Sequence, residues 1–173
     1  MSAGRRLGPL GLSVAALLAA GALSCGKSMV PDTEFPEDYR LYEDSVLGYR
    51  VAYPIQWREE EVPPLTDAPD AIMGGSGFST ALRDSLEVGL WITVVEPTDD
   101  FVRFVEEAEA ERVVVGDLRG YESVMNLWGS MSRSVAFPGD DRWFFVACWA
   151  HPEIFDDYGH IFDDILASFE VID

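Results

Sequence analysis

Hydrophobic and polar side chains alternate along several short segments of this chain. In residues 49–53, Tyr49, Val51 and Tyr53 stand at every second place, and residues 86–95 repeat the pattern with aliphatic side chains. This period of two is typical of a strand with one face on a hydrophobic core. The strands predicted on this basis are 39–53 (two runs around a turn at 45–48), 78–82, 86–95, 113–115, 118–128, 133–137, 143–150 and 169–172.

Two other segments carry the helical period. Thr98 is expected to cap a helix on which Phe101 and Val105 share a face, and which ends near Arg112. A second helix is predicted over residues 156–168. The order of strands, helix, strands and helix, joined by hairpin turns, favours an α+β fold with an antiparallel sheet and helices packed on it.

The segments between these elements are rich in turn-forming residues. Residues 59–70 contain three prolines and five acidic side chains, which predicts an exposed loop. Residues 74–77, Gly-Gly-Ser-Gly, predict a bend that leads into the strand at 78–82.

The first 24 residues have the layout of an export signal. Arg5 and Arg6 precede an uncharged, mostly apolar run at 7–23, and the small or apolar Ala22-Leu23-Ser24 precede Cys25. We therefore predict a lipoprotein signal peptide at 1–24 and lipidation of Cys25. Two alternatives remain open: an uncleaved membrane helix, which 17 residues would barely allow, and a plain secretory signal with Cys25 as a bystander.

The remaining chain divides into a lipidated tether at 25–38 and a domain at 39–173. Acyl chains on Cys25 would hold the protein on a bilayer almost permanently, because each buried methylene contributes ~0.8 kcal/mol. Gly26 after the cysteine favours the outer membrane of a bacterial envelope over the inner one, with the domain facing the periplasm or the exterior.

The charge of the chain limits its partners. The net charge is −19, and it becomes −21 once Arg5 and Arg6 leave with the signal peptide. Such a surface excludes nucleic acid as a partner and repels anionic headgroups, so membrane contact is expected through the acyl chains alone. The 48% hydrophobic content, with 5 Trp, 6 Tyr and 10 Phe, predicts a well-packed core.

Both ends of the domain resemble those of PsbP-like proteins. Residues 48–57, GYRVAYPIQW, resemble the opening strand of that family, and residues 160–172, HIFDDILASFEVI, resemble its terminal helix. The resemblance implies an antiparallel sheet between helices, an α/β/α sandwich. It transfers a fold and not a chemistry, because the shared residues are core and turn residues, and no photosynthetic function is inferred from it.

One cluster of side chains suits a divalent metal. Asp156, His160 and Asp164 are spaced four apart, so they line one helix face, and His151 lies just before them. The same row lies opposite the apolar stripe of the helix. Its polar residues are therefore equally typical of a helix face that is exposed to solvent and binds no metal. The cluster lacks the spacing of a structural zinc site. These four residues are the only metal candidates, and neither a metal nor another cofactor is expected.

No catalytic motif stands out. Residues 74–78 miss the Gly-x-Ser-x-Gly elbow because Phe78 occupies the last place, and Cys148 and His151 should point to opposite faces of an extended chain. Trp91 faces away from its aliphatic neighbours and would line either a groove or a second packing layer, of which we expect the layer. We therefore expect a non-enzymatic binding or assembly module with a protein partner. A metal-binding lipoprotein and a hydrolase with an unrecognised site stay open as alternatives.

Overall fold

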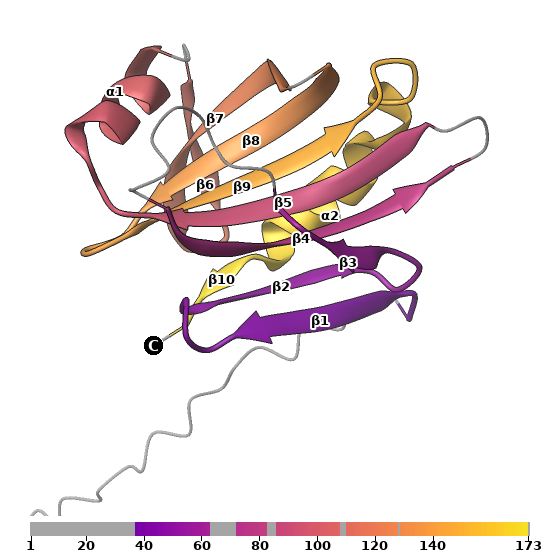
Figure 1. The fold of residues 1–173 in the computed structure, drawn as a ribbon, viewed down its shortest axis with the longest axis horizontal. Helices are drawn as coiled ribbons and strands as arrows, with labels where there is room; N and C mark the ends of the chain where they lie inside the picture. The colour runs from indigo at the N-terminus through magenta and orange to yellow at the C-terminus, as the bar shows by residue number, and fades with distance from the viewer. Residues whose placement is uncertain (1–36, 63–71, 83–85, 108–109, 128, 173) are drawn as a thin grey trace, which may run out of the picture. The chain divides into compact units, whose positions relative to one another are not determined.

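Strands dominate the computed structural model (Figure 1), which describes residues 37–62, 72–82, 86–107, 110–127 and 129–172. All of them belong to one compact unit, Glu34–Asp173. The predicted signal peptide at 1–24, Cys25 and the tether up to residue 36 lie outside the described residues. None of the helices in the described part is long and apolar enough to cross a membrane.

The larger of two antiparallel sheets has seven strands in the order β3-β4-β5-β9-β8-β7-β6. Its strands are β3 (Arg58–Glu60), β4 (Ile72–Ala81), β5 (Glu87–Val95), β6 (Glu111–Val115), β7 (Leu118–Leu127), β8 (Ser130–Pro138) and β9 (Trp143–Ala150). Hairpins connect most neighbours, as the alternating pattern and the turn residues predict. The order places β3 and β6 at the two edges of the sheet.

The smaller sheet has the order β1-β2-β10 and packs on one face of the larger one. Its strands are β1 (Tyr39–Asp44), β2 (Tyr49–Pro54) and β10 (Glu170–Val171). Tyr49, Val51 and Tyr53 point from β2 into the shared core, and the ring of Tyr53 stacks on Phe78 with centroids 4.1 Å apart. The alternating positions that predict the β2 strand are therefore the ones that join the sheets.

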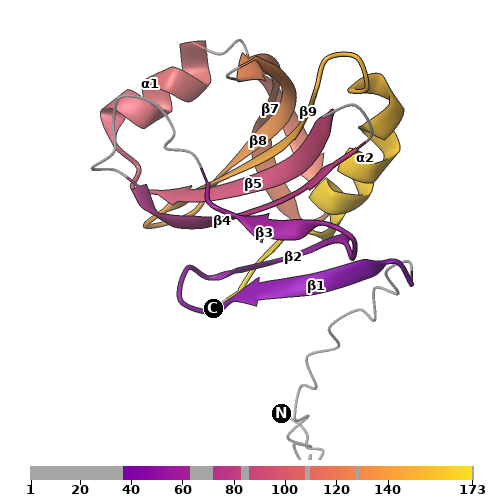
Figure 2. The same ribbon diagram turned by 45° about the vertical axis from the view of Figure 1, so that its right-hand side comes forward.

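The two α-helices lie on opposite faces of the larger sheet (Figure 2). The helix α2 (Gly159–Ser168), preceded by a 3₁₀ turn at Asp156–Tyr158, packs beside the smaller sheet through Phe162, Ile165 and Leu166. The helix α1 (Asp99–Glu107) packs on the other face through Phe101 and Val105.

Ser168, at the end of α2, completes the hydrogen bonding of β2. Its hydroxyl accepts a hydrogen bond from the Ala52 N–H at 2.9 Å and lies 2.6 Å from the Ile165 carbonyl oxygen, to which it donates. Ala52, Ile165 and Ser168 are all buried, and an unpaired N–H in such surroundings would cost about 1–3 kcal/mol. The helix thus takes over the edge of β2 where β10 ends.

Three predicted boundaries were wrong. Residues 74–77 are not a bend but part of β4, because they pair with β5, where the indole of Trp91 occupies the space over Gly77. The predicted loop at 59–70 begins with the edge strand β3, where Glu60 accepts a hydrogen bond from the Trp91 indole N–H at 2.9 Å; residues 63–70 lie outside the described part. The first helix ends at Glu107, not near Arg112, because the β-branched residues that follow pair with β7.

The predicted α/β/α sandwich overstated the helices. The antiparallel, mostly β architecture is confirmed, but only two α-helices occur in the described residues. The smaller sheet covers much of the face that the sandwich would assign to helices, and α1 covers only part of the other. The strand residues 49–53 were read correctly, but nothing local indicates that they form a separate layer.

Candidate functional site

The four metal candidates are not gathered into a site. Asp156, His160 and Asp164 are exposed, and Asp164 lies 3.3 Å from the Tyr39 hydroxyl, from which it accepts a hydrogen bond. The Nδ1 atom of His151 accepts a hydrogen bond from the Glu153 N–H at 3.3 Å. Within the described ranges, no group of three or more His, Cys, Asp and Glu side chains is placed to hold a metal ion.

The aromatic face around Trp91 forms a second packing layer, as expected. The Trp91 and Trp149 rings lie 4.6 Å apart between centroids, and Trp91 packs against the cluster that α1 covers. Gly89 makes this possible, because a Cβ there would come within 2.7 Å of the Trp149 ring. Cys148 points to the opposite face and is fully buried in the main core, away from His151.

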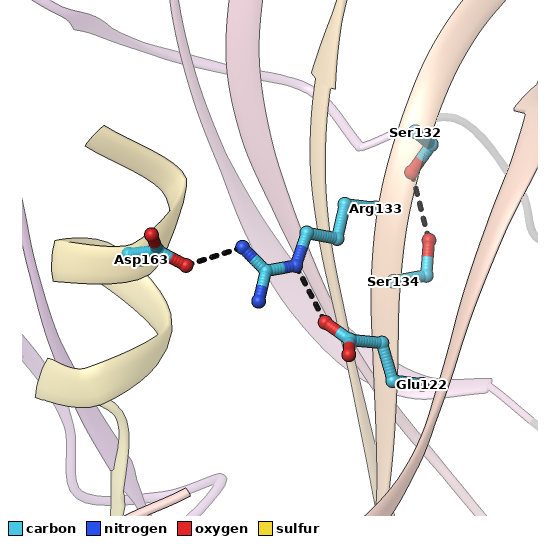
Figure 3. Close-up of polar contacts among 5 residues, drawn as sticks. All are labelled: Glu122, Ser132, Arg133, Ser134 and Asp163. Atoms are coloured by element: carbon cyan, nitrogen blue, oxygen red, sulfur yellow. Dashed lines mark hydrogen bonds and ion pairs between the residues drawn. The ribbon is translucent and has the colours of Figure 1, made fainter. Parts of the chain in front are cut away.

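Arg50, Arg133 and Arg142 form ion pairs with carboxylates in the part of the chain that the structure describes. Figure 3 shows Arg133 reaching from β8 to Asp163 on α2 and to Glu122 on β7, each at 2.5 Å. Burial lowers the pKa of this guanidinium, but the two carboxylates outweigh it and raise the pKa overall. Arg133 therefore fastens α2 to the sheet and is not free for a ligand.

A different situation arises in the β6–β7 hairpin, which turns over only two residues, Gly116 and Asp117. Gly116 has a φ of +57°, in the left-handed region that a two-residue hairpin turn requires and that glycine adopts without steric cost. Val115 pairs with Leu118 directly across the turn. The turn thus fixes the register of the whole hairpin.

This register gathers two arginines on one face. Arg112 is opposite Tyr121 and Val114 is opposite Arg119. Because side chains alternate along a strand, all four lie on the same face, the one that carries α1, and the two arginines are diagonal neighbours. At ~7 Å in water two unit charges repel by only about 0.6 kcal/mol, so the hairpin tolerates the pair.

The acidic side chains of these two strands point the other way. Glu111 is opposite Glu122 on the reverse face of the hairpin, and Glu122 is bound to Arg133. Arg112 and Arg119 are exposed, and neither guanidinium group has a hydrogen bond or ion pair to any residue that the structure describes. In a chain with 31 acidic residues against 12 basic ones, two adjacent unpaired cations are unusual.

The two arginines border a groove of about 310 Å³. Val113, Val114, Tyr121 and Pro138 line the rest of it, with the backbone of Gly120. The Tyr121 ring stacks on Trp143 at 6.2 Å and 11°, and Trp143 in turn meets Phe101 of α1. The groove therefore has a rigid aromatic wall, two cationic side chains and a volume within the range of small-ligand sites.

A second cavity, of about 350 Å³, differs in its electrostatics. It lies between the β1–β2 turn, the β8–β9 turn and the end of the chain, and its cation is Arg142. Arg142 is held by both carboxylate oxygens of Asp141 at 2.9 and 3.0 Å, a contact that lowers the pKa of this carboxyl. Its charge is already matched, so the β6–β7 groove is the better candidate site for an anion.

The strands predicted at 113–115 and 118–128 contained part of this site, including Arg119, but Arg112 was assigned to the end of the preceding helix and neither arginine was identified as a site residue. The signal was available. Folding the chain about Gly116-Asp117 places Arg112 and Arg119 on one face and Glu111 and Glu122 on the other. What local pattern could not show is which face meets α1 and which arginines find acidic partners elsewhere.

The fold is similar to that of solved proteins with low sequence identity. One is the cyanobacterial PsbP protein (CyanoP) from Synechocystis sp. PCC 6803, with a TM-score of 0.54 and 16% identity over 80% of this chain and 95% of that chain. Another is a protein from Bacteroides thetaiotaomicron VPI-5482, with a TM-score of 0.54 and 13% identity over 79% of this chain and 49% of that chain. No family model matches the sequence, and no curated protein matches it either.

These similarities establish the fold and nothing beyond it. The chain has a PsbP-like fold, which confirms the coarse expectation drawn from residues 48–57 and 160–172. The groove between β6 and β7 rests on the residues of this chain alone.

Proposed function

We propose that this chain is a lipid-anchored, non-enzymatic binding module of the bacterial cell envelope, and that the β6–β7 groove receives the anionic part of its ligand or protein partner. The observation that carries the binding role is the unpaired pair Arg112 and Arg119 beside an apolar cavity. Arginine presents a planar fork of donors that matches carboxylate and phosphate oxygens. A bound anion would replace the mutual repulsion of the two cations with attraction.

The anchoring role is supported by the export signal at 1–24 and by Cys25 directly after it. The proposal places the compact unit Glu34–Asp173 outside the inner membrane, attached through acyl chains, with the outer membrane favoured. The acidic surface is consistent with this arrangement, because anionic headgroups repel it and therefore do not hold the domain flat on the bilayer.

The anchor is tested by fractionating cells that express Cys25→Ser, with Cys148→Ala as the matched cysteine control. We expect Cys25→Ser to leave the membrane fraction and Cys148→Ala to stay in it. The mass of the membrane-extracted protein should show loss of residues 1–24 and the added acyl chains. Membrane-extracted parent protein that retains Met1, or that carries no added acyl mass, would contradict the lipid anchor.

The groove is tested by titrating ¹⁵N-labelled residues 26–173 with a small organic anion at constant ionic strength set with chloride. This segment retains the whole compact unit. We expect saturable amide shifts along β6 and β7 that disappear in Arg112→Gln/Arg119→Gln. The matched control is Arg40→Gln, because Arg40 is also exposed and lies on the other sheet. Shifts that are equal in all three proteins would contradict the groove as the binding site.

A further inference from the structure

We infer that the β6–β7 groove selects a ligand that presents a single carboxylate on an apolar body. This inference rests on the proposed binding function and names the chemistry of its ligand. It follows from three properties of the groove: its two cations, its apolar walls and the charge of the surrounding protein.

The cations favour a planar oxyanion. Arg112 and Arg119 are diagonal neighbours on adjacent strands, and both line the same groove. A carboxylate has two oxygens with about four acceptor positions, enough for one fork from each arginine. Arginine–carboxylate contacts of this kind are stronger and more specific in geometry than contacts between neutral groups.

The walls favour an apolar body behind that carboxylate. Val114 is 68% exposed, although it lies between the two arginines on a strand of a well-packed sheet. Tyr121 is half-buried and held by its stack on Trp143, and Pro138 closes the side of the groove toward β8. None of these side chains carries a charge. Burial of hydrocarbon against them therefore stabilises the complex, whereas a further ionic group on the ligand finds no partner among them.

The charge of the protein disfavours more than one negative charge on the ligand. The chain carries −19 in total, and the second anionic charge of a phosphate would be repelled by that surface without meeting a third cation in the described lining of the groove. A monoanion obtains both arginine contacts with the least repulsion. The groove therefore fits a monocarboxylate better than a phosphate.

The test compares four probes by amide shift titration of residues 26–173 at one ionic strength. The probes are 3-phenylpropionate, its neutral amide, phenylphosphonate at a pH where it is a dianion, and acetate. We expect 3-phenylpropionate to bind about tenfold more tightly than each of the other three. The amide lacks the negative charge, phenylphosphonate carries two charges in place of one, and acetate lacks the apolar body. Arg112→Gln and Arg119→Gln should each weaken it about tenfold, and Arg40→Gln should not change it.

Val114→Ala separates the apolar contribution from the ionic one. It should weaken 3-phenylpropionate and leave acetate unchanged, because it removes only hydrocarbon contact. Unchanged thermal unfolding midpoints of all variants would show that the hairpin is intact. A loss of both ligands with an intact fold would contradict the assigned role of Val114.

The same carboxylate chemistry occurs in free small molecules and at the C-terminus of a peptide. A tetrapeptide ending in Phe is therefore titrated with a free and with an amidated C-terminus, beside 3-phenylpropionate. Tighter binding of the free peptide than of the small molecule identifies a chain terminus as the source, and weaker binding identifies a small molecule. Equal binding of the amidated peptide would overturn the requirement for a carboxylate.

The outcomes separate this inference from the proposal beneath it. If phenylphosphonate or the amide binds as tightly as 3-phenylpropionate, the selection of a monocarboxylate is overturned and the groove remains a binding site. If none of the probes shifts β6 or β7, both the inference and the binding role of the groove are overturned.

Discussion

At the scale of single residues, the neighbours of a side chain decide its role more than its type does. The fold brings Glu122 and Asp163 to Arg133, and Arg142 is paired with its sequence neighbour Asp141. No carboxylate that the structure describes pairs with Arg112 or Arg119. Cys148 shows the same effect for a thiol. It is fully buried, and burial raises its pKa above the ordinary value of 9.0.

This pKa shift predicts a loss of stability at alkaline pH. A group whose pKa is raised in the folded state stabilises the fold below its unfolded pKa, here about 9, and that contribution is lost as the pH rises further. The free energy of unfolding of residues 26–173 should therefore fall above pH 9, with Cys148 contributing up to ~1.4 kcal/mol per pH unit. Urea unfolding at several pH values between 7 and 10.5 measures this fall in the free energy of unfolding.

Cys148→Ala provides the control for that measurement. Tyr39 and Tyr49 also have raised pKa values, chiefly through burial, so the variant should retain part of the alkaline loss but fall less steeply than the parent. Identical slopes in the two proteins would show that the thiol does not take part. A thiol reagent at pH 8 should leave the native Cys148 unmodified and react after unfolding.

At the scale of elements, the β6–β7 hairpin is where backbone conformation and candidate function meet. Its two-residue turn sets the register, and the register decides that the arginines share a face while the glutamates share the other. A shift of one residue would exchange the faces and disperse the site. The left-handed φ of Gly116 is therefore a condition for the groove.

Gly116→Ala should destabilise residues 26–173 by about 1 kcal/mol, because an L side chain in the left-handed region costs roughly 1–2 kcal/mol. Gly159→Ala is the matched control. An added Cβ meets nothing within 4 Å at either site, but Gly159 has helical backbone angles, so its replacement should be stabilising by about 0.4–1 kcal/mol. Equal effects of the two substitutions in urea unfolding would argue against backbone strain as the cause.

At the scale of the molecule, the net negative charge opposes part of the stability that the core provides. A main core joins the two sheets and α2, and a second cluster lies under α1, while the chain as a whole carries −19. The cross-linking ion pairs, such as Arg50 with Glu170, are partly exposed and should contribute roughly 0.2–1 kcal/mol each. The net repulsion among the acids should exceed what these pairs contribute.

The thermal unfolding midpoint of residues 26–173 should therefore rise between ~0.01 and ~0.3 M sodium chloride, because screening shortens the Debye length from ~30 Å to under 10 Å. Choline chloride should give the same rise, since screening does not depend on which monovalent cation is present. A midpoint that falls with added salt would mean that attractive ion pairs, and not repulsion, dominate the electrostatics of the fold.

The sequence by itself determined the elements whose signal is local. The period-two strands, the cap at Thr98 (whose Oγ1 accepts the Phe101 N–H at 3.3 Å) and the terminal helix follow from neighbouring side chains, and so do the two end motifs that predicted a PsbP-like fold. The tertiary structure decided the rest. Glycines read as a bend became part of β4 because they pair with β5, where Trp91 packs over Gly77. The predicted helical layer became partly a second sheet. The unpaired state of Arg112 and Arg119 was likewise settled only in three dimensions, because it depends on where carboxylates distant in sequence come to lie.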